Sequence, residues 1–200
     1  MEAVTSTRTR PTRAQTRDRI LRAAGEVFIS RGYDGASLDQ VAAAAGLTKG
    51  AVYSSFSGKD ELFFALVADR LEQRLAAVAE AVDGQRDLQQ LFEYAEDGLA
   101  ALFTTQRDWQ LLFIECWARA VRDPERSAEW AGQRRAARAV IAGFVERHAA
   151  AAGDPLPVPA EDLAVAAMAL SNGLAMEYIA DPESVDPGLF ARMLKQLVKA

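Results

Sequence analysis

The chain has 200 residues, of which 50% are hydrophobic and 26% charged, a composition typical of a soluble globular protein with a substantial core. One cysteine, Cys116, excludes an internal disulfide, and one histidine, His148, disfavours a histidine-dependent catalytic or metal centre. We therefore expect no metal and no cofactor. No apolar segment precedes Arg19, and polar residues interrupt the longest apolar run, Leu163 to Ala180, so we expect neither a secretory signal nor a membrane span, and a cytoplasmic location.

Charge is divided unevenly along the chain. Residues 1–60 carry nine Lys or Arg against six acidic residues, whereas residues 61–200 carry fourteen against twenty-two. The basic front part is therefore the candidate for binding a polyanion. The polar residues 1–15, with Arg8, Arg10 and Arg13, predict a flexible basic arm that contacts a phosphate backbone or a minor groove.

Three helices are predicted next. Helical periodicity begins at Thr16, and Gly32 is expected to stop this helix. Ser37 is a suitable N-cap for a short second helix that Gly46 interrupts, and Thr48 is a suitable N-cap for a third.

The rest of the chain shows only helical periodicity. Helices are predicted over residues 59–82, 88–103, 109–120, 124–152 and 160–180, with a last one for which Asp186 is the N-cap and Pro187 the first residue. No stretch alternates with the period of a strand. The predicted fold is all-α, with about nine helices.

The segment from Ser37 to Phe56 has the pattern of a helix-turn-helix motif, in which the second helix enters a major groove. Val41 and Val52 are placed to fill the small core between its two helices. A tight corner between any two helices gives a similar pattern, so a structural corner is the alternative. The outward residues of the second helix include no acid and suit phosphates and base edges; they are Thr48, Lys49, Gly50, Tyr53 and Ser54.

The stretch from Ile20 to Leu66 resembles the DNA-binding domain of the TetR family of transcriptional regulators. The resemblance rests on Phe28, Gly32, Tyr33, Ala45, Gly46, Thr48, Lys49, Gly50, Tyr53, Phe56, Lys59 and Leu62. It implies a flexible basic arm at 1–15, a helix-turn-helix DNA-binding domain at 16–60, and an effector-binding and dimerisation domain at 61–200.

The resemblance also implies DNA contacts. Ser37 and Lys59 would contact phosphates, and Lys49 would lie near base edges. Many members carry a histidine or a bulkier residue where this chain has Ser55, so the contact of that longer side chain is not carried over. The full set of implied DNA-binding residues is Ser37, Thr48, Lys49, Gly50, Ala51, Tyr53, Ser54, Ser55 and Lys59.

Aromatic residues and a soft sulfur in the second part of the chain suit a small apolar or amphipathic effector. The same spacing is typical of core residues, and the sequence leaves open which of them line a pocket. The candidates are Phe92, Phe103, Trp109, Phe113, Cys116, Trp117, Phe144 and Tyr178.

The last two predicted helices are apolar on more faces than one domain can cover, which predicts a homodimer through a four-helix interface. Burial in a monomer core is the alternative. The candidate interface residues are Ala164, Ala167, Met168, Ser171, Leu174, Ala175, Phe190, Met193, Leu194 and Leu197.

Together these features predict a ligand-responsive, sequence-specific DNA-binding regulator rather than an enzyme. It would act as a repressor that leaves a two-half-site operator when the effector binds. The rivals are an all-α enzyme with a hydrophobic pocket, which lacks paired catalytic groups here, and an interaction protein with no DNA role.

Overall fold

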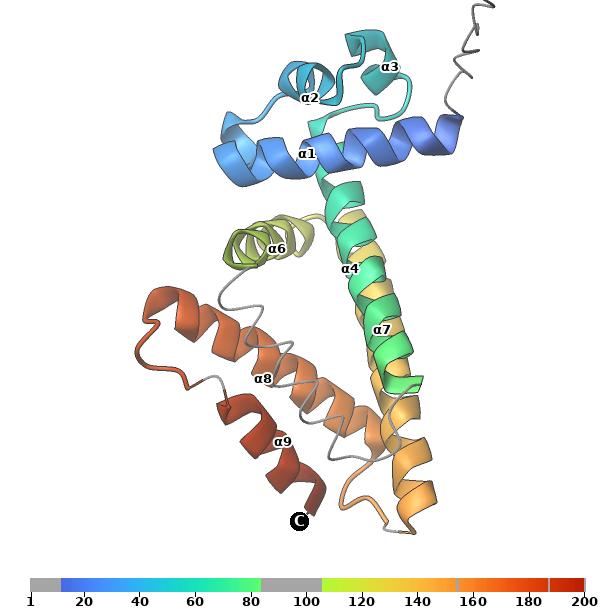
Figure 1. The fold of residues 1–200 in the computed structure, drawn as a ribbon, viewed down its shortest axis with the longest axis vertical. Coiled ribbons are helices and arrows are strands. Elements are labelled where there is room, and N and C mark those ends of the chain that lie inside the picture. The colour runs from blue at the N-terminus through green and yellow to red at the C-terminus, as the bar shows by residue number, and fades with distance from the viewer. Residues whose placement is uncertain (1–11, 84–105, 154, 187, 200) are drawn as a thin grey trace, which may run out of the picture. The chain divides into compact units, whose positions relative to one another are not determined.

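The computed structural model describes residues 12–83, 106–153, 155–186 and 188–199, and every regular element in these ranges is a helix. The all-α prediction is confirmed. Eight helices are labelled α1–α4 and α6–α9 in these ranges (Figure 1), and the predicted helix over 88–103 lies outside the described residues. The chain divides into two compact units, residues 1–67 and 68–200.

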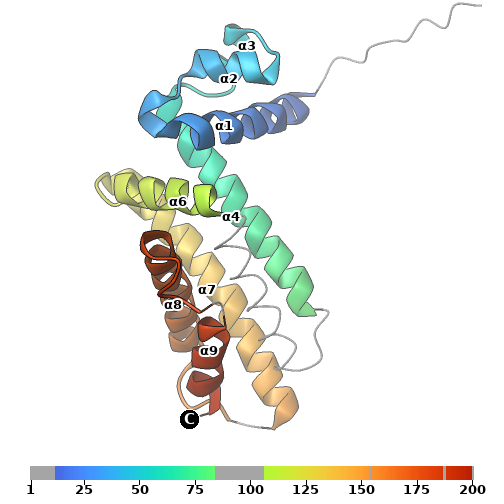
Figure 2. The same ribbon diagram turned by 60° about the vertical axis from the view of Figure 1, so that its left-hand side comes forward.

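The first unit contains α1 (Arg13–Gly35), α2 (Leu38–Ala45), α3 (Lys49–Tyr53) and the beginning of α4 (Lys59–Asp83). Both α2 and α3 lie along the same side of α1 (Figures 1 and 2). The core of this unit is built from fully buried apolar side chains of all four helices and the loop after α3, the largest being Phe28, Phe56, Phe63, Ile20, Leu62, Val41 and Val52.

The first helix begins at Arg13, three residues before the predicted start at Thr16. Thr12 and Gln15 form a capping box: the Thr12 hydroxyl accepts from the Gln15 amide at 3.1 Å, and the Gln15 side chain accepts from the Thr12 amide at 2.9 Å. This reciprocal pair satisfies two amides that a helix start would otherwise leave without partners. Arg13 is therefore helical, whereas residues 1–11 of the predicted arm lie outside the described residues.

The sequence analysis expected the first helix to stop at Gly32, but this glycine only interrupts α1 and does not end it. Its φ of +65° is left-handed, a conformation that glycine adopts without steric cost, and one further helical turn follows to Gly35. The bend carries Tyr33 into the core, where its ring meets Phe63 edge-on at 4.9 Å. Phe28 packs on the same Phe63 ring at 5.0 Å, so one aromatic cluster joins both parts of α1 to α4.

The second unit contains α6 (Arg107–Ala120), α7 (Pro124–Ala152), α8 (Ala160–Ala180) and α9 (Leu189–Lys199) as well as the rest of α4. Helix α8 packs along α7, and α9 lies beside α8 (Figures 1 and 2). The predicted boundary before α7 is confirmed, since the Asp123 carboxylate accepts from the amides of Glu125 and Arg126 and Pro124 occupies the first turn.

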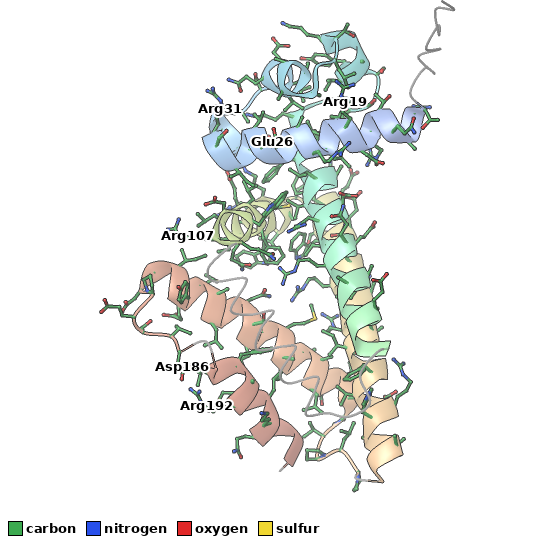
Figure 3. All side chains as sticks on the ribbon, in the orientation of Figure 1. Arg19, Glu26, Arg31, Arg107, Asp186 and Arg192 are labelled. Carbon is green, nitrogen blue, oxygen red and sulfur yellow. The ribbon has the colours of Figure 1, made fainter. Side chains whose placement is uncertain are left out.

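The last helix begins at Leu189, two residues later than the prediction placed it. Asp186 lies just before the helix and makes two contacts there: its carboxylate accepts from the Gly188 amide at 2.8 Å and pairs with Arg192 at 2.7 Å (Figure 3). The amide hydrogen bond and then the Arg192 guanidinium lower the pKa of Asp186. The carboxylate thus closes a turn that precedes the helix.

Helix α8 is long and apolar enough, by length and composition, to cross a membrane. The sequence prediction discounted the segment because Ser171, Asn172 and Glu177 interrupt it. Little of the helix is buried within the subunit. An apolar helix with an uncovered face is also what a subunit interface requires, because a second subunit then covers that face.

Candidate nucleic-acid interface

Local chemistry fixes the two ends of α2. The Ser37 hydroxyl accepts from the Gln40 amide at 3.3 Å, and the Gln40 side chain accepts from the Ser37 amide at 2.9 Å, which completes a second capping box. At the other end Gly46 is left-handed, with φ of +60°, and its amide donates to the Ala43 carbonyl at 3.0 Å. Both predicted helix ends are confirmed, and the turn they make directs the chain into α3.

Helix α3 is held by one cap and two buried side chains. The Thr48 hydroxyl accepts from the Ala51 amide at 3.3 Å, as the N-cap prediction requires. Val52 is fully buried, and Phe56, which follows the helix, is buried to 1% exposure. The short helix therefore has its inner side in the core and its opposite side in solvent.

The structure places the nine predicted DNA-binding residues on or beside α3, at the start of α2 and at the start of α4. Tyr53 is 55% exposed, the only large apolar or aromatic side chain of the first unit's described residues that is so exposed. The exposed members are Ser37, Thr48, Lys49, Gly50, Tyr53 and Ser54, and the half-buried members are Ala51, Ser55 and Lys59.

The two serines after Tyr53 already use their hydroxyls within the helix. Both Ser54 and Ser55 donate to the Ala51 carbonyl, at 2.9 and 3.1 Å. These bonds hold the hydroxyls against the backbone, so the two serines present short side chains at the end of α3.

Lys49 forms an ion pair that the sequence analysis did not predict. Its Nζ lies 2.5 Å from Oδ2 of Asp39 on α2, and the two side chains are 68% and 51% exposed. The hydrogen bond and the charge of Asp39 raise the pKa of Lys49. The outward face of α3 lacks acids, as the sequence indicated, but an acid from the neighbouring helix reaches its lysine.

Lys59 joins the end of α1 to the start of α4. Its Nζ donates to the carbonyls of Tyr33 at 3.0 Å and Asp34 at 3.4 Å, and it lies 4.4 Å from the centre of the Tyr33 ring. The Tyr33 hydroxyl donates to the Asp60 carboxylate. A cation beside the last carbonyls of a helix is favourable, so Lys59 stabilises the end of α1 in addition to any contact with DNA.

Two arginines of α1 support the motif, and the sequence analysis assigned them no such contact. The Arg17 guanidinium lies 4.7 Å from the centre of the Phe56 ring, and Arg19 Nη2 lies 3.5 Å from the Gly46 carbonyl oxygen. Figure 3 labels Arg19 on α1. Both side chains are exposed, so they add positive charge to the surface beside the turn.

The comparisons with known families agree with this geometry. Residues 20–66 match the family model described as bacterial regulatory proteins, tetR family. Residues 93–200, more than half of the chain, match the model described as BetI-type transcriptional repressor, C-terminal. The chain belongs to the TetR family. The resemblance that the sequence analysis stated is thereby confirmed. This TetR protein belongs to the class of DNA-binding helix-turn-helix regulators.

Curated relatives of this TetR protein are similar over part of their length. The regulator SrpR of Pseudomonas putida is 52% identical over 56 residues, which cover 28% of this chain and 26% of SrpR. The repressor Rv1474c of Mycobacterium tuberculosis is 36% identical over 118 residues, which cover 59% of this chain and 58% of Rv1474c. The matched stretches thus span less than two thirds of either relative.

Solved structures share the fold over nearly the whole chain. The regulator FadR from Bacillus subtilis, solved in complex with stearoyl-CoA, aligns with a TM-score of 0.71 over 90% of this chain and 97% of FadR. Sequence identity is 14%, so the likeness concerns the fold alone.

The predicted effector-binding residues of this TetR protein fall into separate groups. Trp109, Phe113 and Cys116 share α6. The Arg70 guanidinium of α4 lies 5.2 Å from the centre of the Trp109 ring, and the Phe113 ring packs on Trp130 of α7 at 5.2 Å. The other candidates are not grouped with these three. Phe144 is buried against Val145 and Leu163, and Tyr178 packs on the cluster of Ala175, Val185 and Phe190. Trp117 is 48% exposed, and Phe92 and Phe103 lie outside the described residues.

The predicted dimer residues divide by exposure. Ala164, Ala175 and Phe190 are buried within the subunit's own core. Met193 and Leu197 on α9 are exposed, whereas Ala167, Met168, Ser171, Leu174 and Leu194 are half-buried. The sequence analysis missed two exposed apolar residues of α8, Val165 and Met176, because helical periodicity alone does not show which apolar stripe the subunit itself covers.

Proposed function

We propose that this TetR protein is a homodimeric, ligand-responsive repressor that reads an operator of two half-sites with α3 of each subunit. The observation that carries the proposal is the outward side of α3. Thr48, Lys49, Gly50 and Tyr53 are exposed there, while Val52 and Phe56 anchor the helix from behind. A hydroxyl, a cation, a glycine and a phenol suit close contact with phosphates and base edges.

Each DNA-binding residue has a proposed role. Lys49, Gly50 and Ala51, at the start of α3, lie nearest base edges, because the first residues of a recognition helix point into the groove. Ser37, Thr48 and Lys59 contact phosphates. Tyr53 contacts a phosphate and a base, and Ser54 and Ser55 lie at the margin.

The dimer would form through α8 and α9. Val165, Met176, Met193 and Leu197 are exposed on these two helices, although each is a large apolar side chain. Covering them with the same surface of a second subunit gives the isologous interface that a two-half-site operator needs.

The effector would bind within residues 68–200 and act by population shift. A ligand that prefers one arrangement of the two DNA-binding units lowers operator affinity by favouring an arrangement with the wrong half-site spacing. The related proteins support the type of response: Rv1474c is named a repressor, and FadR was solved with an acyl-CoA.

Selection of bound fragments from genomic DNA, followed by mobility shift at several salt concentrations, tests the proposal. We expect one or a few sites with two similar half-sites and a steep loss of affinity as salt rises. A reporter under the selected promoter then decides the sign of regulation, and higher expression without the protein indicates a repressor. Binding to all fragments alike would contradict sequence-specific recognition, and lower expression without the protein would indicate an activator.

A further inference from the structure

Arg134 is a half-buried cation in the middle of α7. On a helix it shares a face with Trp130, Ile141 and Val145, of which Trp130 and Val145 are buried and Ile141 packs in the core. Within the part of the chain that the structure describes, its guanidinium has no carboxylate, hydrogen-bond or ring partner. A guanidinium carries five N–H donors, so this side chain has capacity to bind an anion.

The neighbouring charges do not neutralise Arg134. Arg138, one turn later, is itself a cation and pairs with Glu161 of α8 at 3.2 Å. Burial, and then the charge of Arg138, lower the pKa of Arg134. A half-buried cation that has gained no partner among the described residues is less favourable than a paired one, and a bound anion would relieve this.

A second donor that has no partner among the described residues lies on α6, the helix that packs on α7. Gln110 of α6 is only 5% exposed, and its Nε2 has no hydrogen-bond partner among the described residues. Helices α6 and α7 meet where Phe113 packs on Trp130. Gln110 precedes Phe113 by about one helical turn, and Arg134 follows Trp130 by about one turn, so both donors border one aromatic contact.

We propose that the effector is an amphipathic carboxylate whose anionic group binds Arg134, with Gln110 as a further donor and the aromatic residues of α6 and α7 against its apolar body. This inference rests on the proposed function, since it specifies the ligand of the effector-binding unit. An arginine without a counter-ion selects an anion and repels a cation such as a quaternary amine.

Stability of the ligand-free protein gives the first test. Arg134→Met removes the charge and keeps an apolar stem, and Arg135→Met removes the same charge from an exposed neighbour as the matched control. We expect the melting temperature to rise by about 2–8 °C in Arg134→Met and to be unchanged in Arg135→Met. If the melting temperature falls in Arg134→Met and not in Arg135→Met, the guanidinium stabilises the ligand-free subunit, and the proposal is overturned.

Binding of three probes with a ten-carbon chain gives the second test: decanoate and decyltrimethylammonium, each below its micelle concentration, and decanol below its solubility limit. We expect decanoate to raise the melting temperature of the wild-type protein more than the other two. Its affinity should fall about ten- to a hundredfold in Arg134→Met and be unchanged in Arg135→Met. Equal affinity in Arg134→Met, or preference for decanol or the ammonium probe, would overturn the inference.

The three probes and the two variants distinguish failure of this inference from failure of the proposed function. Stabilisation by decanol alone would leave an effector site in place and reject an anionic ligand. Loss of operator binding on addition of decanoate, in the wild-type protein but not in Arg134→Met, would support both. Binding of none of the three probes, together with an unchanged melting temperature in Arg134→Met, would reject the anion site.

Discussion

The described part of the DNA-binding unit covers its own apolar side chains, whereas the described part of the second unit does not. In residues 12–67 the one large exposed hydrophobic or aromatic side chain is Tyr53, which lies on the proposed DNA-reading surface. In residues 106–199 there are several: Leu111, Trp117, Val121, Val158, Val165, Met176, Met193 and Leu197.

Polar groups show the same contrast. The buried side-chain atoms without hydrogen-bond partners among the described residues include Arg70 Nε, Gln106 Oε1 and Gln110 Nε2, and all three belong to the second unit. Apolar faces need a cover and buried donors need acceptors. The described part of the first unit therefore covers its own apolar and polar groups, and the uncovered groups of the second unit are consistent with the proposed partner subunit and ligand.

Removal of an aromatic core side chain should have the largest effect. Phe63→Ala deletes the ring that Phe28 and Tyr33 both contact, so we expect about 3–5 kcal/mol less stability by chemical denaturation of the full chain. Val158→Ala, at an exposed position of the second unit, should change stability by less than about 0.5 kcal/mol. Similar losses in both variants would contradict the contrast in burial.

A charge on the exposed face of α9 should disrupt the proposed dimer. Leu197→Glu places two carboxylates in an isologous interface, and we expect the dimer dissociation constant, measured by sedimentation, to rise by at least about a hundredfold. Val158→Glu, outside the proposed interface, is the control. Wild-type assembly in Leu197→Glu would exclude this face as the interface.

Loss of the Lys59 charge should affect both folding and DNA binding. Lys59→Met leaves the last carbonyls of α1 without their cation, so we expect about 1–2 kcal/mol less stability. Affinity should fall for all DNA sequences alike, and the salt slope should decrease by about one unit per subunit. Arg22→Met, which removes an exposed cation of α1, controls for net charge. A change in base preference would instead make Lys59 a sequence-reading residue.

Removal of the acid that pairs with Lys49 should strengthen DNA binding. Asp39→Asn frees the lysine and removes a negative charge near the phosphates, so we expect up to about tenfold tighter binding at low salt. The gain should shrink as salt rises. Asp18→Asn removes an exposed acid of α1 and is the matched control. An equal gain in both variants would show that only net charge matters.

The smallest effect is expected from a thiol reagent on the native protein, because its one cysteine, Cys116, is buried. Burial raises the pKa of its thiol from 9.0 to about 12. The raised pKa means that the stability contributed by the protonated thiol is fully present below pH 9.0 and is lost as the pH rises toward about 12. Ellman's reagent at pH 8 should therefore react only after denaturation; rapid reaction of the native protein would contradict the burial of this thiol.

The helix ends of the recognition motif were predictable because each depends on a few neighbouring residues. Ser37 and Thr48 accept bonds from amides three residues ahead, and Gly46 adopts a left-handed conformation that its own lack of a side chain permits. Thr12 obeys the same rule with Gln15, and the sequence analysis missed that signal within a segment it took for a flexible arm.

The sequence could not show which apolar helix faces of the second unit are buried in the subunit's own core. Phe144 and Tyr178 have the aromatic character expected of a pocket, yet both pack into clusters of the subunit core. Periodicity says which side chains share a face of a helix, but which face is covered depends on helices far away in the chain.

The all-α class, the TetR motif and the caps that shape it could thus be predicted from the amino-acid sequence, because each rests on patterns among residues close together in the chain. Three features could be learned only from the folded chain: Asp39 pairs with Lys49, Lys59 binds the last carbonyls of α1, and Arg134 has no partner among the described residues. Such contacts join residues distant in the chain, and their electrostatics depend on distance and burial that no local pattern encodes.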